Sequence, residues 1–496
     1  MSKTNSINKY INSIIVFINN LLEKNLNKLK SKNLLKVARS EKIVLTFVAL
    51  VVLSLIYLLM PTLYKQSDIS KKLKTELSSK LNLEFEFSKK LDYNFFPRPH
   101  FKTEDVIIKK NQKEISEIKQ LKTYISLENF FSVKNLKINK IILDNANFNL
   151  NNQNYNFFLN LLDNDFKDNK LKIKNSNIFF RDKENEILFI NKIIDMKYFY
   201  DPNVLKNLVF SENEIFNLTY ELRLYKDNVN KKIFSKVNLN LFKFYLENEF
   251  DYSNEIKKGN TDLILNKFKS KVKYNKNNQL FEFKYFDKLE NPSFFYKGTF
   301  NLNPFYSSLE GNVEKLNLSH LINSNAFIIQ VLKTEILNNK NIDFVLKIDA
   351  KKIHNHINFK NIIINSKIKE SLIDVDNTTF KWKNFVDFNL TNSLIYIKNG
   401  ELVLDGKLHI NIKDDNQIYK YLLTPKNYRK KLKKVDLNFS YNFDQKSTLL
   451  RDIRINEKYH QKINKIMSNI ILKDTNVQNK IYFKNILNEA IKSYSG

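Results

Sequence analysis

Hydrophobic positions divide the chain into two regions of different periodicity. Residues 43–60 form a run of eighteen uncharged, mostly apolar residues that ends at Pro61. As a helix rising about 1.5 Å per residue, this run covers roughly 27 Å, close to the hydrocarbon thickness of a bilayer. From residue 83 onward, apolar residues instead alternate with polar ones, as in strands with one apolar and one polar face. The pattern predicts one transmembrane helix followed by a long series of strands.

The flanks of the apolar run predict its orientation. Seven Lys and Arg residues lie between residues 23 and 42, against two Glu. Positive flanks tend to stay cytoplasmic, so we expect residues 1–42 in the cytoplasm, an anchor over 43–63 and an exported part over 64–496. The alternative is a cleaved signal peptide, which would have a shorter leader and a small-residue cleavage site. The predicted anchor residues are Ile43, Val44, Leu45, Phe47, Val48, Leu50, Val51, Val52, Leu53, Leu55, Ile56, Leu58, Leu59 and Met60.

The leader itself carries a weaker pattern. Apolar residues recur every three or four positions from Ile7 to Leu22, with Asn and Lys between them. Such a helix could lie in the headgroup plane of a membrane. A cytoplasmic stalk without a ligand fits the same pattern, so both interpretations stay open.

Helices interrupt the predicted strands at few places. Ile69, Leu73, Leu77 and Leu81 recur every four residues and predict a helix that Asp68 or Ser70 can cap. Further helices are expected over 316–337, over 419–432 around Pro425, and over 479–494. About 430 residues exceed the size of one compact core. We therefore expect a mainly β fold, built as an elongated stack in which each strand needs only its neighbours.

Apolar side chains on one face of every strand need a partner surface. A filled sandwich or closed barrel is one solution. The other is an open, curled sheet whose apolar face forms a groove for hydrophobic molecules such as acyl chains. Composition does not choose between them.

Lysine supplies nearly all of the positive charge. The chain has 82 Lys and Arg residues, only seven of them Arg, against 52 Asp and Glu, for a formal net charge of +30. Nucleic-acid sites depend on Arg and cluster charge on one face, whereas here Lys is spread along the whole chain. We expect no nucleic-acid partner, although anionic lipid headgroups would attract such a surface.

Two residue types exclude whole classes of chemistry. Cysteine is absent, which removes disulfides, thiolate nucleophiles and Cys-based metal sites. Only six Gly are present and they form no cluster, whereas phosphate loops and dinucleotide fingerprints need Gly at fixed positions. We expect no cofactor.

The remaining candidate residues do not form a catalytic pattern. His354 and His356 lie in a strand-like segment, where both imidazoles would face one side. Carboxylates are sparse nearby, so exposed or partly packed histidines are the favoured interpretation. The pairs Asp163/Asp165 and Asp414/Asp415 are interpreted as solvated turns, not as catalytic carboxylates or cation loops. The sequence predicts no enzyme, no catalytic residue and no metal site.

The order of segments after the anchor resembles that of a known family. The helix over 69–81 precedes an alternating strand over 83–87, then Tyr93-Asn-Phe-Phe-Pro-Arg-Pro-His-Phe101, then the strand region 130–150. This looks like the N-terminal region of the AsmA family of Gram-negative bacterial envelope proteins, most clearly over 43–150. The family-like structural motif comprises Phe96, Pro97, Pro99 and Phe101. Where the family usually has Gly, this chain has Asn82 and either Asn175 or Asn177, and Asn tolerates positive φ.

The resemblance implies a location and a function. It predicts a single-pass inner-membrane protein with a periplasmic β-rich domain over 64–496, whose AsmA-like N-terminal motif covers about 64–150. It also implies a curled sheet with an apolar groove that handles phospholipids or transfers them toward the outer membrane, in support of outer-membrane biogenesis. Membrane lipids, and possible envelope proteins, would be the partners. The alternative is an assembly scaffold with a self-filled β domain that binds a protein partner.

Overall fold

The computed structural model describes Val16 and most of residues 41–495. The gaps in the latter range are 129, 152, 183, 266–267, 278–279, 287–294, 303–304, 318–326, 335–342, 370–371, 469–471 and 474–479. The amphipathic pattern over residues 7–22 therefore lies outside the described residues, apart from Val16.

The chain divides into two compact units. The first, which we call the anchor unit, comprises Met1–Leu73, Leu91–Lys102 and Tyr124–Ile138. The second, the sheet unit, comprises Lys74–Lys90, Thr103–Thr123 and Asn139–Gly496. Each is described by itself below.

The predicted apolar helix is present in the anchor unit. It consists of α3 (Glu41–Leu59) and the 3-10 turn η1 (Met60–Leu63). Residues Thr46–Leu63 are long and apolar enough to cross a membrane, and their side chains are largely exposed on the protein. Among them, Phe47, Leu50 and Leu53 are each more than 60% exposed. A helix with this composition has no buried stripe of its own and needs an apolar environment around it.

The helix predicted after the anchor is α4 (Gln66–Leu81). Its apolar stripe is buried, since Ile69, Leu73, Leu77 and Leu81 are at most 4% exposed. The predicted cap is wrong, because the helix begins before Asp68, whose own N–H already donates to the Lys65 carbonyl at 3.1 Å. Asp68 lies instead in the first helical turn, where a carboxylate is favoured by the helix dipole.

The fold is mainly β, as predicted, and 26 strands belong to one sheet. The first strands are β1 (Glu84–Phe87), β2 (Asp92–Asn94), β3 (His100–Lys110), β4 (Lys113–Ile125), β5 (Ile138–Leu150), β6 (Lys170–Arg181), β7 (Ile187–Asp201), β8 (Lys206–Ile215) and β9 (Leu218–Asp227). The middle strands are β10 (Lys232–Leu239), β11 (Phe244–Asp251), β12 (Lys257–Leu265), β13 (Phe268–Asn277), β14 (Leu280–Phe286), β15 (Phe295–Leu302), β16 (Phe305–Leu316), β17 (Asp343–Ile353) and β18 (His356–Lys369). The last strands are β19 (Leu372–Asp374), β20 (Thr379–Trp382), β21 (Val386–Lys398), β22 (Glu401–Ile412), β23 (Lys434–Asn442), β24 (Ser447–Ile455), β25 (Lys458–Tyr459) and β26 (Leu472–Lys473).

Short helices lie between these strands. They are η2 (Val133–Asn135), α5 (Phe157–Asn160), η3 (Leu161–Asp163), η4 (Asn240–Phe242), α7 (Phe327–Leu332), α8 (Asp415–Leu422), η6 (Lys426–Tyr428), α9 (Gln461–Ser468) and α11 (Lys480–Ser495). The helix predicted over 479–494 is thus α11. The one predicted over 419–432 is wrong in its bounds, because α8 begins at Asp415 and ends at Leu422, before Pro425. The helix expected over 316–337 is wrong at its start, because Leu316 belongs to β16; within the described residues of this range, the helical part is α7.

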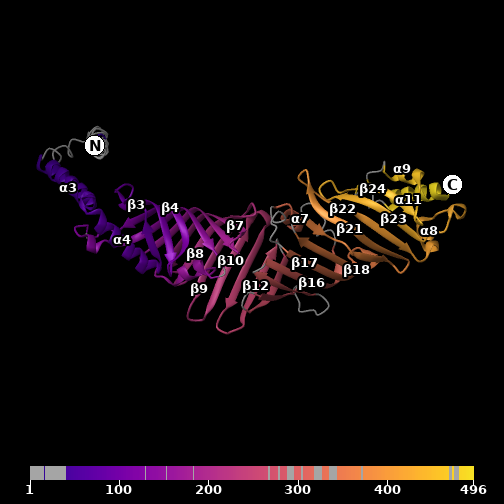
Figure 1. Cartoon of the computed structure of the whole chain (residues 1–496), viewed down its shortest axis with the longest axis horizontal. Helices are drawn as coiled ribbons and strands as arrows, with labels where there is room; N and C mark the ends of the chain where they lie inside the picture. Colours follow the sequence, from indigo (N-terminus) through magenta and orange to yellow (C-terminus); the bar gives the residue numbers. More distant parts are fainter. Residues whose placement is uncertain are drawn as a thin grey trace, which may run out of the picture. The chain divides into compact units, whose positions relative to one another are not determined.

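Strands that follow one another in the chain lie beside one another in the sheet (Figure 1). From β6 to β16 every neighbouring pair is antiparallel. Two pairs on either side of this run, β5–β6 and β16–β17, are parallel. A parallel pair needs a crossover, and helices commonly form it. The crossovers here contain α5 with η3 and α7, respectively.

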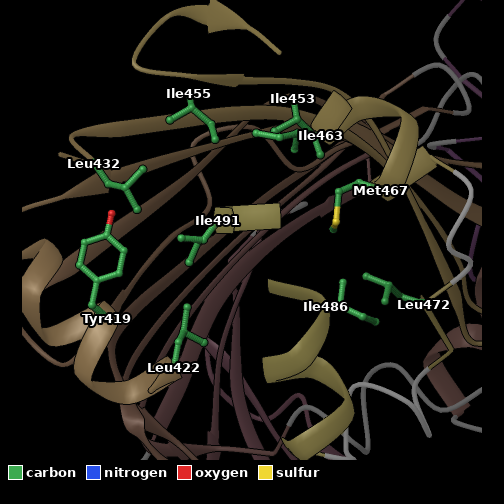
Figure 2. Close-up of a cluster of buried hydrophobic side chains, with 10 residues drawn as sticks. All are labelled: Tyr419, Leu422, Leu432, Ile453, Ile455, Ile463, Met467, Leu472, Ile486 and Ile491. Carbon is green, nitrogen blue, oxygen red and sulfur yellow. The ribbon is translucent and has the colours of Figure 1, made fainter. Parts of the chain in front are cut away.

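Apolar side chains are buried in clusters near the start and the end of the sheet unit, and also at β16–β18 and beneath α7. Near its start, Phe157 of α5 packs on Phe148 of β5 with ring centroids 5.7 Å apart, and the ring of Phe166 lies 5.6 Å from that of Tyr198 in β7. Near the end of the chain, α8, α9 and α11 cover strands β23 and β24 (Figure 2). The C-terminal cluster consists of Tyr419, Leu422, Leu432, Ile453, Ile455, Ile463, Met467, Leu472, Ile486 and Ile491.

Candidate functional site

The middle strands carry a continuous apolar face. Period-two alternation puts every second side chain on one side, and the strand register aligns these positions from strand to strand. One such row runs Val272, Tyr285, Tyr296 from β13 to β15. We call this side the apolar face and define it by Val237, Leu246, Leu263, Val272, Tyr274, Phe283, Tyr285, Tyr296, Phe300, Leu309 and Leu346.

The protein itself covers this face only in part. Among the described residues, no hydrophobic side chain between Leu218 and Val313 is fully buried. All the residues that define the apolar face have intermediate exposure. In β13 the contrast between faces is regular, since Val272 and Tyr274 are half-buried while Lys271, Lys273 and Asn275 are exposed. A continuous row of apolar side chains that the protein leaves partly exposed is a feature of many binding surfaces.

The opposite face of the same strands is charged. Lys236 in β10 lies directly opposite Glu247 in β11, and their charged atoms are 2.7 Å apart. Lys297 in β15 pairs in the same way with Glu310 in β16 at 3.2 Å. These pairs are exposed, so each contributes little stability, but they keep this face in water. The sheet is therefore amphipathic, and its apolar side is the one that needs a partner.

Three of the six glycines lie on the apolar face, each opposite an aromatic residue. The register pairs are Gly259 with Tyr274, Gly298 with Phe283, and Gly311 with Tyr296. A Cβ added to Gly259 would lie 1.9 Å from Tyr274 Cζ, and one added to Gly311 would lie 2.3 Å from Tyr296 Cε1. Each ring therefore lies over the backbone of its glycine, as in the aromatic rescue of sheet glycines. This arrangement lets large rings lie flat on the sheet.

A small polar network interrupts the apolar face. The Asn248 side-chain carbonyl accepts hydrogen bonds from the Thr261 hydroxyl at 2.8 Å and from the Tyr274 hydroxyl at 3.0 Å. Burial raises the pKa of Tyr274, and the Asn248 bond opposes this shift. The hydroxyl thus stays protonated, and the network presents few unsatisfied polar atoms to an apolar ligand.

Lysines occur at the border of the apolar side, where Lys276 in β13 and Lys257 in β12 are register partners. Lys276 lies opposite Phe281 in the register, with its Nζ 5.5 Å from the centre of that ring. Burial lowers the pKa of Lys276, and the nearby positive charge of Lys257 lowers it further. An anionic group that approached this ammonium would relieve both effects.

The family-like motif lies in the anchor unit, away from the apolar face in the sequence. Phe101 is fully buried against Tyr93, at 5.3 Å between ring centroids. The Pro99 carbonyl accepts the Ile125 N–H at 3.1 Å. Pro97 follows a cis peptide bond, and Phe96 is 78% exposed. Two of these residues therefore have clear structural roles.

Two of the three Asn residues noted in the sequence have positive φ. Asn82 has a φ of 54° and Asn175 a φ of 46°, and Asn177 is not among the positive-φ residues. Asn82 follows the end of α4, where its N–H donates to the Ser78 carbonyl at 2.9 Å. Asn175 lies inside β6, and its amide donates to Asp144 at 3.0 Å. Whether these residues replace glycines of the family stays a prediction.

The two candidate histidines lie where β17 turns into β18. His354 and Asn355 form the turn, Asn355 has a φ of 63°, and His356 is the first residue of β18. The prediction of one continuous strand is therefore wrong at His354 and Asn355. Both histidines are exposed, as the favoured interpretation expected. Within the described parts of the chain, no group of three potential metal ligands exists.

The two acidic pairs also have structural roles. Asp163 binds the side chains of Lys226 and Asn228, both at 2.8 Å. Asp414 caps α8 through the Gln417 N–H. The interpretation of Asp415 as part of a solvated turn is wrong, because it is only 5% exposed and accepts the Leu432 N–H at 3.1 Å.

Comparisons with known proteins do not add to this picture. No protein-family model matches the chain, no curated protein matches it, and no solved structure matches it. The resemblance to the AsmA family therefore stays a prediction from the sequence motif alone, and functional inference depends on the two units described above.

Proposed function

We propose that this protein binds the acyl chains of membrane phospholipids on the apolar face of its sheet. The observation that carries the proposal is the partly exposed row of apolar side chains over β10–β17, opposite a charged face. In the cell, an inner-membrane anchor formed by α3 would place this face in the periplasm, where it would pass phospholipids toward the outer membrane. The family resemblance supports that location and direction.

The size of the apolar face suits acyl chains. Eight strands at about 4.8 Å spacing span roughly 34 Å, whereas the acyl layer of one leaflet is about half of the 30 Å hydrocarbon core. The face could therefore accommodate about two chains end to end. Each methylene moved from water to such a surface contributes about 0.8 kcal/mol, so binding needs no specific polar contact. A face lined by rings and branched side chains fits this demand.

Site-specific photocrosslinking tests the proposal within a single strand. A photoreactive amino acid replaces Phe283 or Tyr285 on the apolar face of β14, and Lys284 between them serves as the matched control. The full chain is then irradiated in native membranes. We expect phospholipid adducts at 283 and 285, detected by mass spectrometry, and none at 284.

Two outcomes would contradict lipid binding. Equal lipid labelling at all three positions would mean that the sheet face does not select lipid. A protein adduct at 283 and 285 in place of lipid would favour the alternative, an envelope scaffold whose apolar face binds a protein partner.

A further inference from the structure

The anchor unit attaches a loop to the side of the apolar helix. The Tyr57 hydroxyl of α3 donates to the Leu127 carbonyl at 2.5 Å and accepts the Phe130 N–H at 3.2 Å. Its ring stacks on Phe130 and lies beside Phe131, in both cases at 5.2 Å between centroids. This loop, residues 126–136, therefore runs along the last turns of the helix.

A second segment is attached to the same helix end. The Tyr93 hydroxyl of β2 donates to the Leu58 carbonyl at 2.6 Å. The Gln66 side chain donates to the Leu91 carbonyl at 2.8 Å and accepts the Leu91 N–H at 3.3 Å. Burial raises the pKa of Tyr93, so its hydroxyl stays a hydrogen-bond donor. Two loops are thus fixed to the helix by bonds that a flexible linker would lack.

These loops and the helix end expose large apolar side chains. The exposed fractions are 77% for Leu63, 78% for Phe96, 55% for Leu127 and 72% for Phe131. Phe130 is fully buried by comparison, so the loop has an inward and an outward apolar residue side by side. The ring of Phe131 contacts Tyr57, yet most of this side chain remains exposed.

The depth of this surface follows from its contact with Tyr57. Tyr57 lies six residues before Leu63, the end of the segment that is apolar enough to cross a membrane. At a rise of 1.5–2.0 Å per residue, this is about 10 Å along the helix axis. Phe131 lies beside Tyr57, so a membrane that enclosed the helix would also meet Phe131 and Leu127. A protein partner could reach these residues only by displacing lipid.

Cationic side chains accompany the exposed apolar ones. Lys65 follows Leu63, Arg98 follows Phe96 and Lys134 follows Phe131, each within three residues. All three cations are exposed. Apolar groups below and cations at headgroup level are the composition of segments that lie in a membrane interface.

We propose that Leu127 and Phe131 insert into the same bilayer leaflet that surrounds the C-terminal end of α3, with Phe96 and Leu63 at its surface. The anchor unit would then be seated in the membrane by two loops as well as by the helix. The proposal rests on α3 crossing the membrane, but not on lipid binding by the apolar face of the sheet.

Single-cysteine variants test this membrane insertion directly, because the chain has no native cysteine. The variants F131C and L127C carry an environment-sensitive fluorophore in the full chain, reconstituted in vesicles of phosphatidylcholine and phosphatidylglycerol. Phosphatidylcholine with a nitroxide on its acyl chain serves as the quencher. L50C in α3 is the membrane-inserted control. V229C is the aqueous control, since Val229 lies in the turn between β9 and β10 and is 91% exposed.

We expect quenching at positions 131 and 127 to be several-fold stronger than at 229 and comparable with that at 50. Quenching at 131 and 127 as weak as at 229, with strong quenching at 50, would overturn the proposal. Weak quenching at 50 would overturn it too, because the helix would then not be in the bilayer. Neither result depends on crosslinking at Phe283. Failure of the membrane-insertion proposal can therefore be distinguished from failure of the lipid-binding proposal.

Discussion

Replacement of the glycines on the apolar face should separate stability from lipid binding. At an unhindered strand position, Gly→Ala stabilises by about 0.5–1 kcal/mol, because alanine has less backbone entropy to lose. Gly298 is hindered: an added Cβ would lie 2.2 Å from the Ser308 backbone oxygen and 2.5 Å from Phe283 Cζ. Since a backbone atom cannot rotate away, β15 and β16 must move apart. Overpacking of this kind costs about 1–3 kcal/mol, so we expect Gly298→Ala to destabilise the protein by about 1–2 kcal/mol.

Gly311 differs in what its Cβ would meet. The three nearest atoms all belong to the Tyr296 ring, at 2.3–3.3 Å, and this ring, which is partly exposed and packs against the cluster around Val313, can shift as a backbone atom cannot. We expect Gly311→Ala to change stability by less than about 1 kcal/mol, because the gain in strand preference offsets the displaced ring. The ring would then project from the apolar face beside Tyr285, whose ring centroid is 5.6 Å away. Fewer lipid adducts should therefore form at position 285.

Thermal unfolding of the detergent-solubilised full chain, followed by intrinsic fluorescence, gives the order of stabilities. Gly400→Asn is the control, since Gly400 has a φ of +79° and an added Cβ would meet no atom within 4 Å, and Asn tolerates positive φ. We expect wild type, Gly400→Asn and Gly311→Ala to unfold at similar temperatures, above Gly298→Ala. A Gly298→Ala protein as stable as wild type would refute the close backbone approach. Unchanged lipid adducts in Gly311→Ala would refute the role given to the flat ring.

Three further substitutions test the described structure by thermal unfolding. Asn175→Gly should leave the free energy of unfolding unchanged or raise it, whereas Asn175→Ala should lower it by about 1–2 kcal/mol. The reason is that alanine is strained at a φ of 46°. Equal effects of the two substitutions would contradict this. Asn464→Ala should destabilise the protein by about 2–3 kcal/mol. The Asn464 side chain accepts the buried Ile453 N–H at 2.6 Å and donates to the Ile453 carbonyl at 2.8 Å. Lys465→Ala, at the neighbouring position, is the control. Burial alone would raise the pKa of Asp415, but bonds from the Leu432 N–H and Lys431 hold it below its usual value, so its contribution is present at neutral pH and lost as the pH falls below about 4. The stability difference between wild type and Asp415→Asn should shrink over that range, and a constant difference would contradict the assignment.

Periodicity in the sequence predicted the elements better than their ends. Spacing of four placed the buried stripe of α4, and alternation over 83–87 placed β1, because both patterns are set by burial on one side. The ends of helices and strands depend on local hydrogen bonds, which cannot be predicted from the spacing of apolar residues. Asp68 looks like a cap, yet the Lys65 carbonyl starts the helix first. The His354–His356 strand failed for a similar reason, since Asn355 takes a positive φ.

The apolar face could be predicted only as an alternative. Alternation marks Phe283 and Tyr285 as facing one side, but whether that side is filled depends on which strands pair and what covers them. The opposition of Gly298 to Phe283 is likewise a property of the register. A glycine within an alternating segment was the signal available in the sequence for this contact. The residue opposite that glycine could not be named without the strand register. The anchor-unit loops were missed because Phe130 and Phe131 look equivalent in the sequence.

The topology explains why the middle of the sheet is left uncovered. Parallel pairing requires a long crossover, and the two crossovers at β5–β6 and β16–β17 are where α5 and α7 occur. Between them, antiparallel neighbours are joined by connections of two to eight residues, and those that the structure describes contain no α-helix. The described connections therefore leave the apolar face of β10–β15 without a helix packed on it. Its alternation nevertheless keeps large apolar residues on one side, which would be a cost in water. A bound apolar ligand would account both for the missing cover and for the apolar residues on this face. A lipid is such a ligand, and it needs no surface of complementary shape.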